Sequence, residues 1–172
     1  MMGGNPRKLW LFYSVAISIF GLCQVISNWV ERTLPQHEPQ AVLPFLNLTH
    51  VRNYGGIFGI AQGMGWVIAL LASLVLLMVV VFIHKGQVMR AFEYACYGLI
   101  VGGGCANVCD RIVYGSVIDY LDVQGIPYWN YIFNAADLSI HVGIWPLILY
   151  GLLSRKKPDE GTEPAKPVEG AS

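Results

Sequence analysis

The chain has 172 residues, of which 55% are hydrophobic and only 13% are charged. Soluble domains usually contain about 25% charged residues, and the mean hydropathy of this chain is +0.50. Its apolar residues form blocks that are too long and too uniform for the core of a soluble enzyme, which excludes that class. Eleven basic and eleven acidic residues give no net charge, so the total charge does not indicate nucleic-acid binding. The composition indicates an integral membrane protein.

Four apolar blocks are expected to cross the bilayer as helices. A spanning helix needs roughly 20 mostly apolar residues, because each residue adds about 1.5 Å across a hydrocarbon core about 30 Å thick. Residues 9–30 and 64–83 meet this requirement without a charge. Residues 94–109 and 138–153 are shorter, and the last block starts at residue 133 if its polar beginning is included. The ends of these two blocks must therefore hold polar groups near the lipid headgroups.

Basic residues predict the orientation of the helices. They flank the first block, the short second connection and the end of the fourth block: Arg7, Lys8, Lys85, Arg90, Arg155, Lys156 and Lys157. Positively charged flanks favour the cytoplasm, so both chain ends and residues 84–90 are predicted inside, with residues 31–63 and 109–137 outside. Residues 1–154 then form a single membrane domain. Residues 155–172 are polar and rich in proline, and are predicted to be a disordered cytoplasmic tail.

Both outer connections contain segments typical of β-strands. Residues 46–49 and residues 118–120 alternate apolar and polar side chains, which is the pattern of a strand with one buried face. We therefore predict a small outer sheet lying on four helices.

The second outer connection also contains four acidic residues, namely Asp110, Asp119, Asp122 and Asp137. Asp110 ends the third apolar block and Asp137 begins the fourth, so both are predicted near the outer hydrocarbon boundary. Ionisable groups at membrane depth are costly and indicate functional sites, although a solvated loop acid is an equally good interpretation of any single one. Asn134 lies one helical turn before Asp137, where it can orient the carboxylate through a hydrogen bond.

Two close carboxylic acids in a sheltered site share one proton, because both cannot ionise cheaply. The ionised acid can take a proton from water while the protonated acid supports a carbonyl oxygen, which is the arrangement of an aspartic protease. The four cysteines form no C-x-x-C pair and the histidines are scattered, so metal and disulfide roles are weaker predictions. Ser139 and His141 point to different faces of a helix, which disfavours a serine hydrolase.

Four short motifs occur along the chain in a fixed order. Residues 53–58 read N-Y-G-G-I-F, residues 107–111 read N-V-C-D-R, residues 117–120 read V-I-D-Y and residues 133–137 read F-N-A-A-D. In this order and on this topology they resemble the N-x-G-x-x-F, G-N-x-x-D-R, V-[VI]-D-[FY] and F-N-x-A-D motifs of the lipoprotein signal peptidases, also called signal peptidase II. The resemblance covers about residues 9–155.

The resemblance implies that Asp119 and Asp137 are the catalytic pair. It also implies a set of residues that bind the substrate or support the acids: Asn53, Gly55, Asn107, Asp110, Arg111 and Asn134. Asp110 is expected to support the structure, whereas Asp122 matches no acid of the family and is expected to be a spectator. The implied site contains no metal and no cofactor.

The fold implied by the resemblance has four transmembrane helices, a small extracytoplasmic β-cradle and a short amphipathic surface helix. The implied protein is a bacterial aspartic endopeptidase of the cytoplasmic (inner) membrane, monomeric, with its active site at the extracytoplasmic face. Its implied substrates are diacylglyceryl-modified prolipoproteins, whose signal peptide it removes by cutting before the lipidated cysteine. Membrane lipid and the peptide antibiotics that inhibit the family are further implied partners, and nucleic acid is not one.

Two departures from the family pattern concern the first and third helices. The family usually carries D-Q-x-x-K in the first span, whereas residues 23–27 here read C-Q-V-I-S, and Ala106 replaces the glycine before Asn107. Loss of the acid and the lysine is expected to remove a polar support from the outer end of the first helix. Because both aspartates are present, an active enzyme with altered stability, substrate range or inhibitor response is favoured. The alternatives are a non-catalytic or inhibitor-tolerant paralogue that binds lipoproteins or a peptide antibiotic, and a small proton-coupled carrier.

Overall fold

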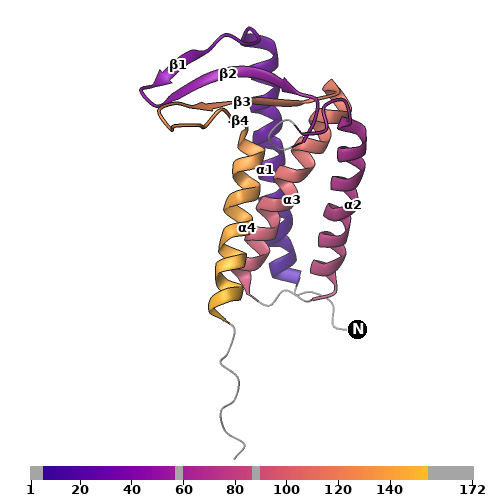
Figure 1. Cartoon of the computed structure of the whole chain (residues 1–172). Coiled ribbons are helices and arrows are strands. Elements are labelled where there is room, and N and C mark those ends of the chain that lie inside the picture. The colour runs from indigo at the N-terminus through magenta and orange to yellow at the C-terminus, as the bar shows by residue number, and fades with distance from the viewer. Residues whose placement is uncertain (1–5, 57–59, 87–89, 155–172) are drawn as a thin grey trace, which may run out of the picture.

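The computed structural model describes residues 6–56, 60–86 and 90–154, so the predicted tail at 155–172 lies outside the described residues. The chain forms, in order, α1 (Pro6–Thr33), β1 (Gln40–Leu43), β2 (Leu46–Asn53), α2 (Gly65–His84), α3 (Ala91–Tyr114), β3 (Val117–Val123), β4 (Ile132–Phe133) and α4 (Ala135–Leu153). The helices form an upright bundle, and the strands form a sheet across one end of it (Figure 1).

The helices alternate in direction along the chain. As a result, the beginning of α1 and the end of α4 lie at the end of the bundle opposite the sheet (Figure 1). Lys85, which follows α2, and Arg90, which precedes α3, lie at that same end. The basic connection and the sheet are therefore on opposite sides of the bundle, as the predicted topology requires.

Three of the helices, α1, α2 and α4, are long and apolar enough to cross a membrane on length and composition. Their outward faces carry many exposed large apolar side chains, such as Leu70 on α2 and Leu149 on α4. Such a surface is expected where lipid rather than water surrounds the helix. The membrane helices predicted from the first, second and fourth apolar blocks are therefore present. Helix α3, which contains the third block, differs from them in its surroundings.

Helix α3 is 24 residues long and contacts each of the other three helices. It extends beyond the predicted block of residues 94–109 at both ends. The carboxylate of Glu93 accepts a hydrogen bond from the backbone N–H of Arg90 at the start of the helix, and the helix ends at Gly115, whose φ of 73° is the left-handed conformation common after helices. The polar groups at its ends are satisfied within the protein and the helix packs against three others, so α3 needs less apolar surface than a lipid-facing helix.

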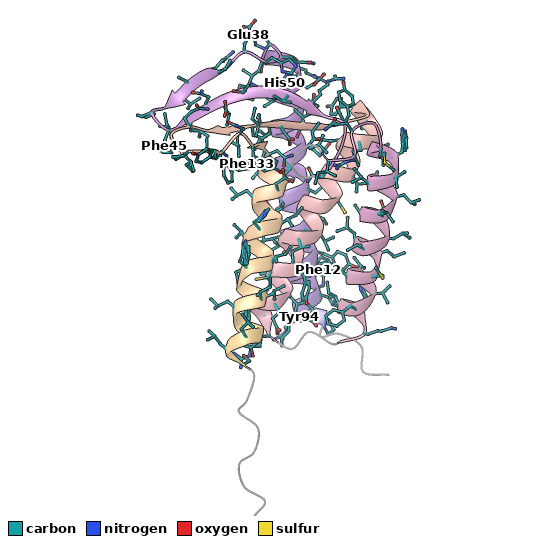
Figure 2. All side chains as sticks on the ribbon, in the orientation of Figure 1. Phe12, Glu38, Phe45, His50, Tyr94 and Phe133 are labelled. Carbon is teal, nitrogen blue, oxygen red and sulfur yellow. The ribbon has the colours of Figure 1, made fainter. Side chains whose placement is uncertain are left out.

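Glycines let α3 pack closely against its neighbours. A Cβ atom added to Gly102 would lie 2.6 Å from the carbonyl oxygen of Ala16 on α1, and one added to Gly103 would lie 2.5 Å from that of Ala136 on α4. Only a residue without a side chain permits such close backbone contact. Figure 2 shows Phe12 and Tyr94, which belong to an apolar core cluster, at the end of the bundle far from the sheet.

The sheet is antiparallel, with the strand order β1-β2-β3-β4. Its two longest strands contain the segments 46–49 and 118–120, which confirms both strand predictions. Ile118 and Tyr120 on β3 pack against Val30 near the end of α1. Because successive residues of a strand point to opposite faces, Asp119 is directed away from that core.

Contacts from β2 also hold the sheet on the bundle. His50 and Arg52 both pair with Glu31 on the last turns of α1, and the His50 Nε2 atom lies 3.1 Å from a Glu31 carboxylate oxygen. The short surface helix implied by the family resemblance is not seen among the described residues. Between β2 and α2 the chain makes turns at 60–63, and residues 57–59 lie outside the described part.

Candidate active site

Two carboxylates lie together where the sheet meets the bundle. Asp119 comes from the middle of β3 and is only 3% exposed, and Asp137 comes from the first turn of α4. Both line one cavity of about 490 Å³, which Asn53, Asn107 and Arg111 also line. The structure therefore brings the two acids singled out in the sequence to the same cavity.

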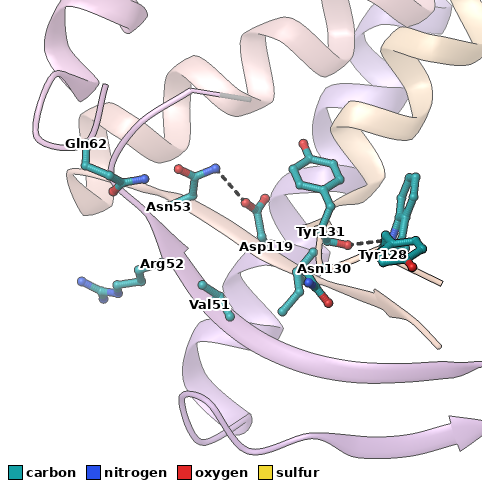
Figure 3. A pocket seen from close by; sticks show the side chains of 10 residues that line it. Val51, Arg52, Asn53, Gln62, Asp119, Tyr128, Asn130 and Tyr131 are labelled. Carbon is teal, nitrogen blue, oxygen red and sulfur yellow. Dashed lines mark hydrogen bonds between the residues drawn. The ribbon is translucent and has the colours of Figure 1, made fainter. Parts of the chain in front are cut away.

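Each oxygen of Asp119 accepts a hydrogen bond from an asparagine amide. Asn53 Nδ2 donates to one oxygen at 3.1 Å, as Figure 3 shows, and Asn134 Nδ2 donates to the other at 2.8 Å. Burial and the nearby charge of Asp137 nevertheless raise the pKa of Asp119 to about 7. A carboxyl group with this pKa can hold a proton near neutral pH, unlike an exposed aspartate.

Asp137 is held by α3 and by the start of its own helix. Asn107 Nδ2 donates to one carboxylate oxygen at 2.8 Å, and the backbone N–H of Asn134 donates to the other at 3.3 Å. In return, the Asn134 side-chain oxygen accepts a hydrogen bond from the backbone N–H of Asp137 at 2.9 Å. This reciprocal pair is a capping box, so the residue that begins α4 also fixes the carboxylate.

Asn134 differs in detail from the prediction made from the sequence. Its side chain was expected to orient the Asp137 carboxylate, but the group that does so is its backbone N–H. Its amide nitrogen instead donates to Asp119 and to the Asn107 side-chain oxygen, the latter at 3.2 Å. Asn134 thus connects both acids, because it lies between the end of β4 and the first residue of α4.

Arg111 fixes the backbone around the cavity rather than bonding to an acid directly. Its guanidinium donates to the carbonyl oxygens of Asn107 at 3.0 Å and Gly55 at 2.9 Å. Gly55 also donates its backbone N–H to the side-chain oxygen of Asn53 at 3.0 Å. A Cβ atom at Gly55 would lie 2.5 Å from the Ile60 carbonyl oxygen, so this tight turn requires glycine.

Asp110 faces a different part of the molecule. It is 2% exposed, and its carboxylate accepts hydrogen bonds from Gln24 Nε2 at 2.8 Å and from the backbone N–H of Ile118 at 3.3 Å. Ser27 also bonds to it. The bond to Ile118 ties the end of α3 to the strand residue beside Asp119.

The divergent first-span motif makes polar contacts with Asp110 toward the sheet end of α1. Gln24 and Ser27 supply hydrogen bonds to Asp110 without the lysine of the family pattern. Cys23 takes the place of the acid and is buried against Ala106 and Ala136. Among the described contacts, the side chains of α1 that bond to Asp110 are therefore neutral.

Asp122 lies on β3 beyond Asp119 and does not line the cavity that the two acids share. Its carboxylate accepts hydrogen bonds from Thr49 Oγ1 at 2.8 Å and from Gln124 Nε2 at 2.7 Å. Within the described part of the chain, no three His, Cys, Asp or Glu residues are grouped so that they could hold a metal ion.

Tyr131 is a cavity residue that the sequence analysis missed. It lines the shared cavity together with Asp119 and Asp137, and burial raises its pKa to about 12, so the phenol stays protonated. Trp129, Tyr131 and Phe133 are spaced two residues apart, and their rings lie 6.0 to 6.5 Å from one another. This period-two aromatic pattern was the signal that could have revealed the cluster.

A bundle of apolar helices with a sheltered pair of carboxylates beneath its sheet indicates an integral membrane enzyme. The family model described as Signal peptidase (SPase) II matches residues 15–153. The lipoprotein signal peptidase of Caulobacter vibrioides is 36% identical over 157 residues, which cover 87% of this chain and 91% of that protein. That of Pasteurella multocida is 34% identical over 139 residues, covering 78% and 84%.

A solved structure described as a bacterial membrane enzyme superimposes with a TM-score of 0.78 at 29% identity, over 93% of this chain and 98% of that one. The chain belongs to the signal peptidase II family, and is a bacterial membrane peptidase of the lipoprotein-processing kind.

Proposed function

We propose that the chain is an aspartic endopeptidase that removes the signal peptide from diacylglyceryl-modified prolipoproteins by cutting before the lipidated cysteine. The observation that supports this most strongly is the pair of carboxylates, Asp119 and Asp137, lining one cavity and held by three asparagines. The membership of the chain in the signal peptidase II family supplies the substrate class.

Hydrolysis by this pair uses one shared proton. The ionised acid takes a proton from water as the water oxygen attacks the scissile carbonyl carbon, and the protonated acid gives its proton to the carbonyl oxygen. The resulting tetrahedral diol collapses as the C–N bond breaks. One acid then protonates the leaving nitrogen while the other takes a proton from the diol, so a carboxylic acid and an amine are released and the pair again holds one proton.

The proposed active site faces the extracytoplasmic side of the inner membrane. Supporting this, the basic residues Lys85 and Arg90 lie at the opposite end of the bundle, and positive charge favours the cytoplasm. Asp137 stands in the first turn of α4, at the end of the bundle that carries the sheet (Figure 1), and we propose that a lipid-anchored peptide leaves the bilayer at this level. We expect the protein to act as a monomer, as the resemblance to the family implies.

Lipid is a required part of the proposed substrate. The acyl chains would lie in the bilayer beside the helices, and each buried CH₂ group adds about 0.8 kcal/mol of binding free energy. An unlipidated precursor should therefore be turned over negligibly. Peptide antibiotics that inhibit the family are proposed ligands of the same cavity.

Complementation tests the function directly. The chain is expressed in a bacterial strain that lacks its own signal peptidase II, and prolipoprotein size is followed on a gel. The expected result is conversion of the precursor to the mature size. Good expression without any mature product would contradict the proposal and favour a non-catalytic lipoprotein-binding paralogue.

A further inference from the structure

Three cavities surround the carboxylate pair, and among the described residues Tyr131 is the one that lines all of them. An outer cavity of about 470 Å³ contains Asp119, and a cavity of about 310 Å³ on the α4 side contains Asp137. The third, of about 490 Å³, contains both acids. The two acids can therefore be approached from two directions, and Tyr131 stands where these directions meet.

The outer and the α4-side cavities differ in chemistry. The outer cavity carries polar side chains that suit a peptide backbone, including Arg52, Gln62 and Asn130. The cavity on the α4 side is lined mainly by apolar side chains, including Phe133 and Leu138. Leu138 is 51% exposed on the outward face of α4, so this second cavity opens toward lipid.

One contact to the backbone and one to the ring hold Tyr131 in place. The Trp129 indole N–H donates to the Tyr131 carbonyl oxygen at 3.0 Å. The Tyr131 ring lies nearly parallel to that of Phe133, with 17° between the planes and 6.1 Å between the centroids. Figure 3 shows the ring beside Asp119, standing up from the strand side of the cavity. A ring fixed in this way forms a wall rather than a movable side chain.

We propose that Tyr131 determines specificity by separating the cavity that takes the peptide from the cavity that takes the acyl chains. This inference rests on the proposed function. The substrate branches at its lipidated cysteine, where the peptide continues in one direction and the diacylglyceryl group in another. A wall where the outer and the α4-side cavities meet, beside the cavity that contains both acids, brings the bond before that cysteine within reach of the two carboxylates.

Two variants distinguish the contribution of the Tyr131 ring from that of its hydroxyl group. Tyr131→Phe keeps the wall, whereas Tyr131→Ala joins the two cavities. Each purified full-length variant is given two synthetic lipopeptides that share one peptide and carry either long or short acyl chains. The measured quantity is the ratio of kcat/KM for the long-chain substrate to kcat/KM for the short-chain substrate. Because both values come from one preparation, an unfolded fraction cancels in the ratio.

Wild-type protein should prefer the long-chain substrate, and Tyr131→Phe should keep that ratio. In Tyr131→Ala the ratio should fall at least about tenfold, the low end of what a hydrophobic pocket contributes to discrimination. A wild-type ratio in Tyr131→Ala would overturn the inference, as would an equal fall in Tyr131→Phe. If Tyr131→Ala is inactive on both substrates, Tyr131→Leu must show the fall instead, and an unchanged ratio there overturns the inference.

The same experiment distinguishes this inference from the proposed function. A wild-type protein that cleaves neither lipopeptide would contradict the proposed function itself. A wild-type protein that cleaves both, together with an unchanged ratio in Tyr131→Ala, would leave the proposed function intact and remove the role assigned to Tyr131.

Discussion

Asn134 holds the two carboxylates through different parts of its structure. Its backbone N–H and side-chain oxygen form the capping box with Asp137, while its amide nitrogen donates to Asp119 and Asn107. The first set of contacts starts a helix and the second orients an acid. A substitution can therefore remove one set and keep the other.

Asn134→Ser should lower cleavage with little effect on stability. Serine caps helices as asparagine does, but it lacks the amide that donates to Asp119. Misplacing a reacting group by about 1 Å can reduce the rate about 10²-fold, and we expect a loss of that size in kcat. Asn134→Ala should lose about 1 kcal/mol of stability as well, because the cap is removed. Thermal unfolding tests the expected stabilities, and the rate of cleavage tests the expected loss in kcat. An Asn134→Ser variant with wild-type kcat would contradict the role of the amide.

The pKa of Asp119 predicts the pH dependence of activity. Burial and the charge of Asp137 raise this pKa to about 7, so the proton that the pair shares is present below that pH and lost above it. The mechanism needs this proton, and kcat/KM should therefore fall as the pH rises through about 7, by about tenfold per unit well above it. A profile measured with one lipopeptide from pH 5 to pH 9 tests this. Activity that stays constant to about pH 9 would exclude a shared proton.

At the level of whole elements, the position of α4 depends on its close contact with α3. Gly103→Ala would place a Cβ atom 2.5 Å from the Ala136 carbonyl oxygen, one residue before Asp137. Overpacking of this kind typically destabilises by about 1–3 kcal/mol. We expect a lower unfolding temperature and reduced cleavage, because the start of α4 must move.

The matched control for this change is Gly21→Ala on α1. A Cβ atom at Gly21 meets nothing within 4 Å, and alanine favours helix more than glycine does. This variant should keep wild-type cleavage and stability. Equal effects of the two substitutions would contradict the importance of the contact between α3 and α4.

Elements with a strong repeating pattern were predictable from the sequence. Long apolar blocks predicted the membrane helices, and alternation predicted the strands around 46–49 and 118–120. The extent of α3 was underestimated, because the charged residues at its ends are satisfied by hydrogen bonds within the protein rather than placed in lipid. Glu93 caps the start of the helix, and Asp110 bonds to residues on α1 and β3. Such contacts cannot be read from the composition of one segment.

In the site, too, local motifs were predictable and contacts between distant segments were not. The short motifs predicted that Asp119, Asp137 and the asparagines lie together, and the structure places them in contact. The support of Asp110 by Gln24 joins residues 86 positions apart, and the cavity-lining role of Tyr131 depends on the sheet edge. The contact between Gln24 and Asp110 could not be predicted, because it results from the packing of distant segments. The aromatic residues at 129, 131 and 133 form a local pattern, but the position of Tyr131 beside both acids depends on the fold.

For the whole molecule, the orientation in the membrane can be tested with two engineered cysteines. Ser154→Cys at the end of α4 should be labelled from the cytoplasmic side only, and Gln36→Cys, just before β1, from the outside only. The four native cysteines are buried or half-buried within α1 and α3, which limits background labelling. Labelling of position 154 by an impermeant reagent added outside intact cells would refute the proposed topology.

The most direct test of the aspartic mechanism is cleavage of a lipidated precursor by purified Asp119→Asn and Asp137→Asn variants. Asparagine keeps the size and hydrogen bonding of each side chain but cannot transfer the proton. Each variant should lose about 10²–10⁴-fold in kcat, and the double variant should be little worse because the acids act as a unit. Asp122→Asn is the matched control and should cleave normally, since Asp122 bonds only to Thr49 and Gln124 among the described contacts. Cleavage by Asp137→Asn at close to the wild-type rate would contradict the catalytic pair.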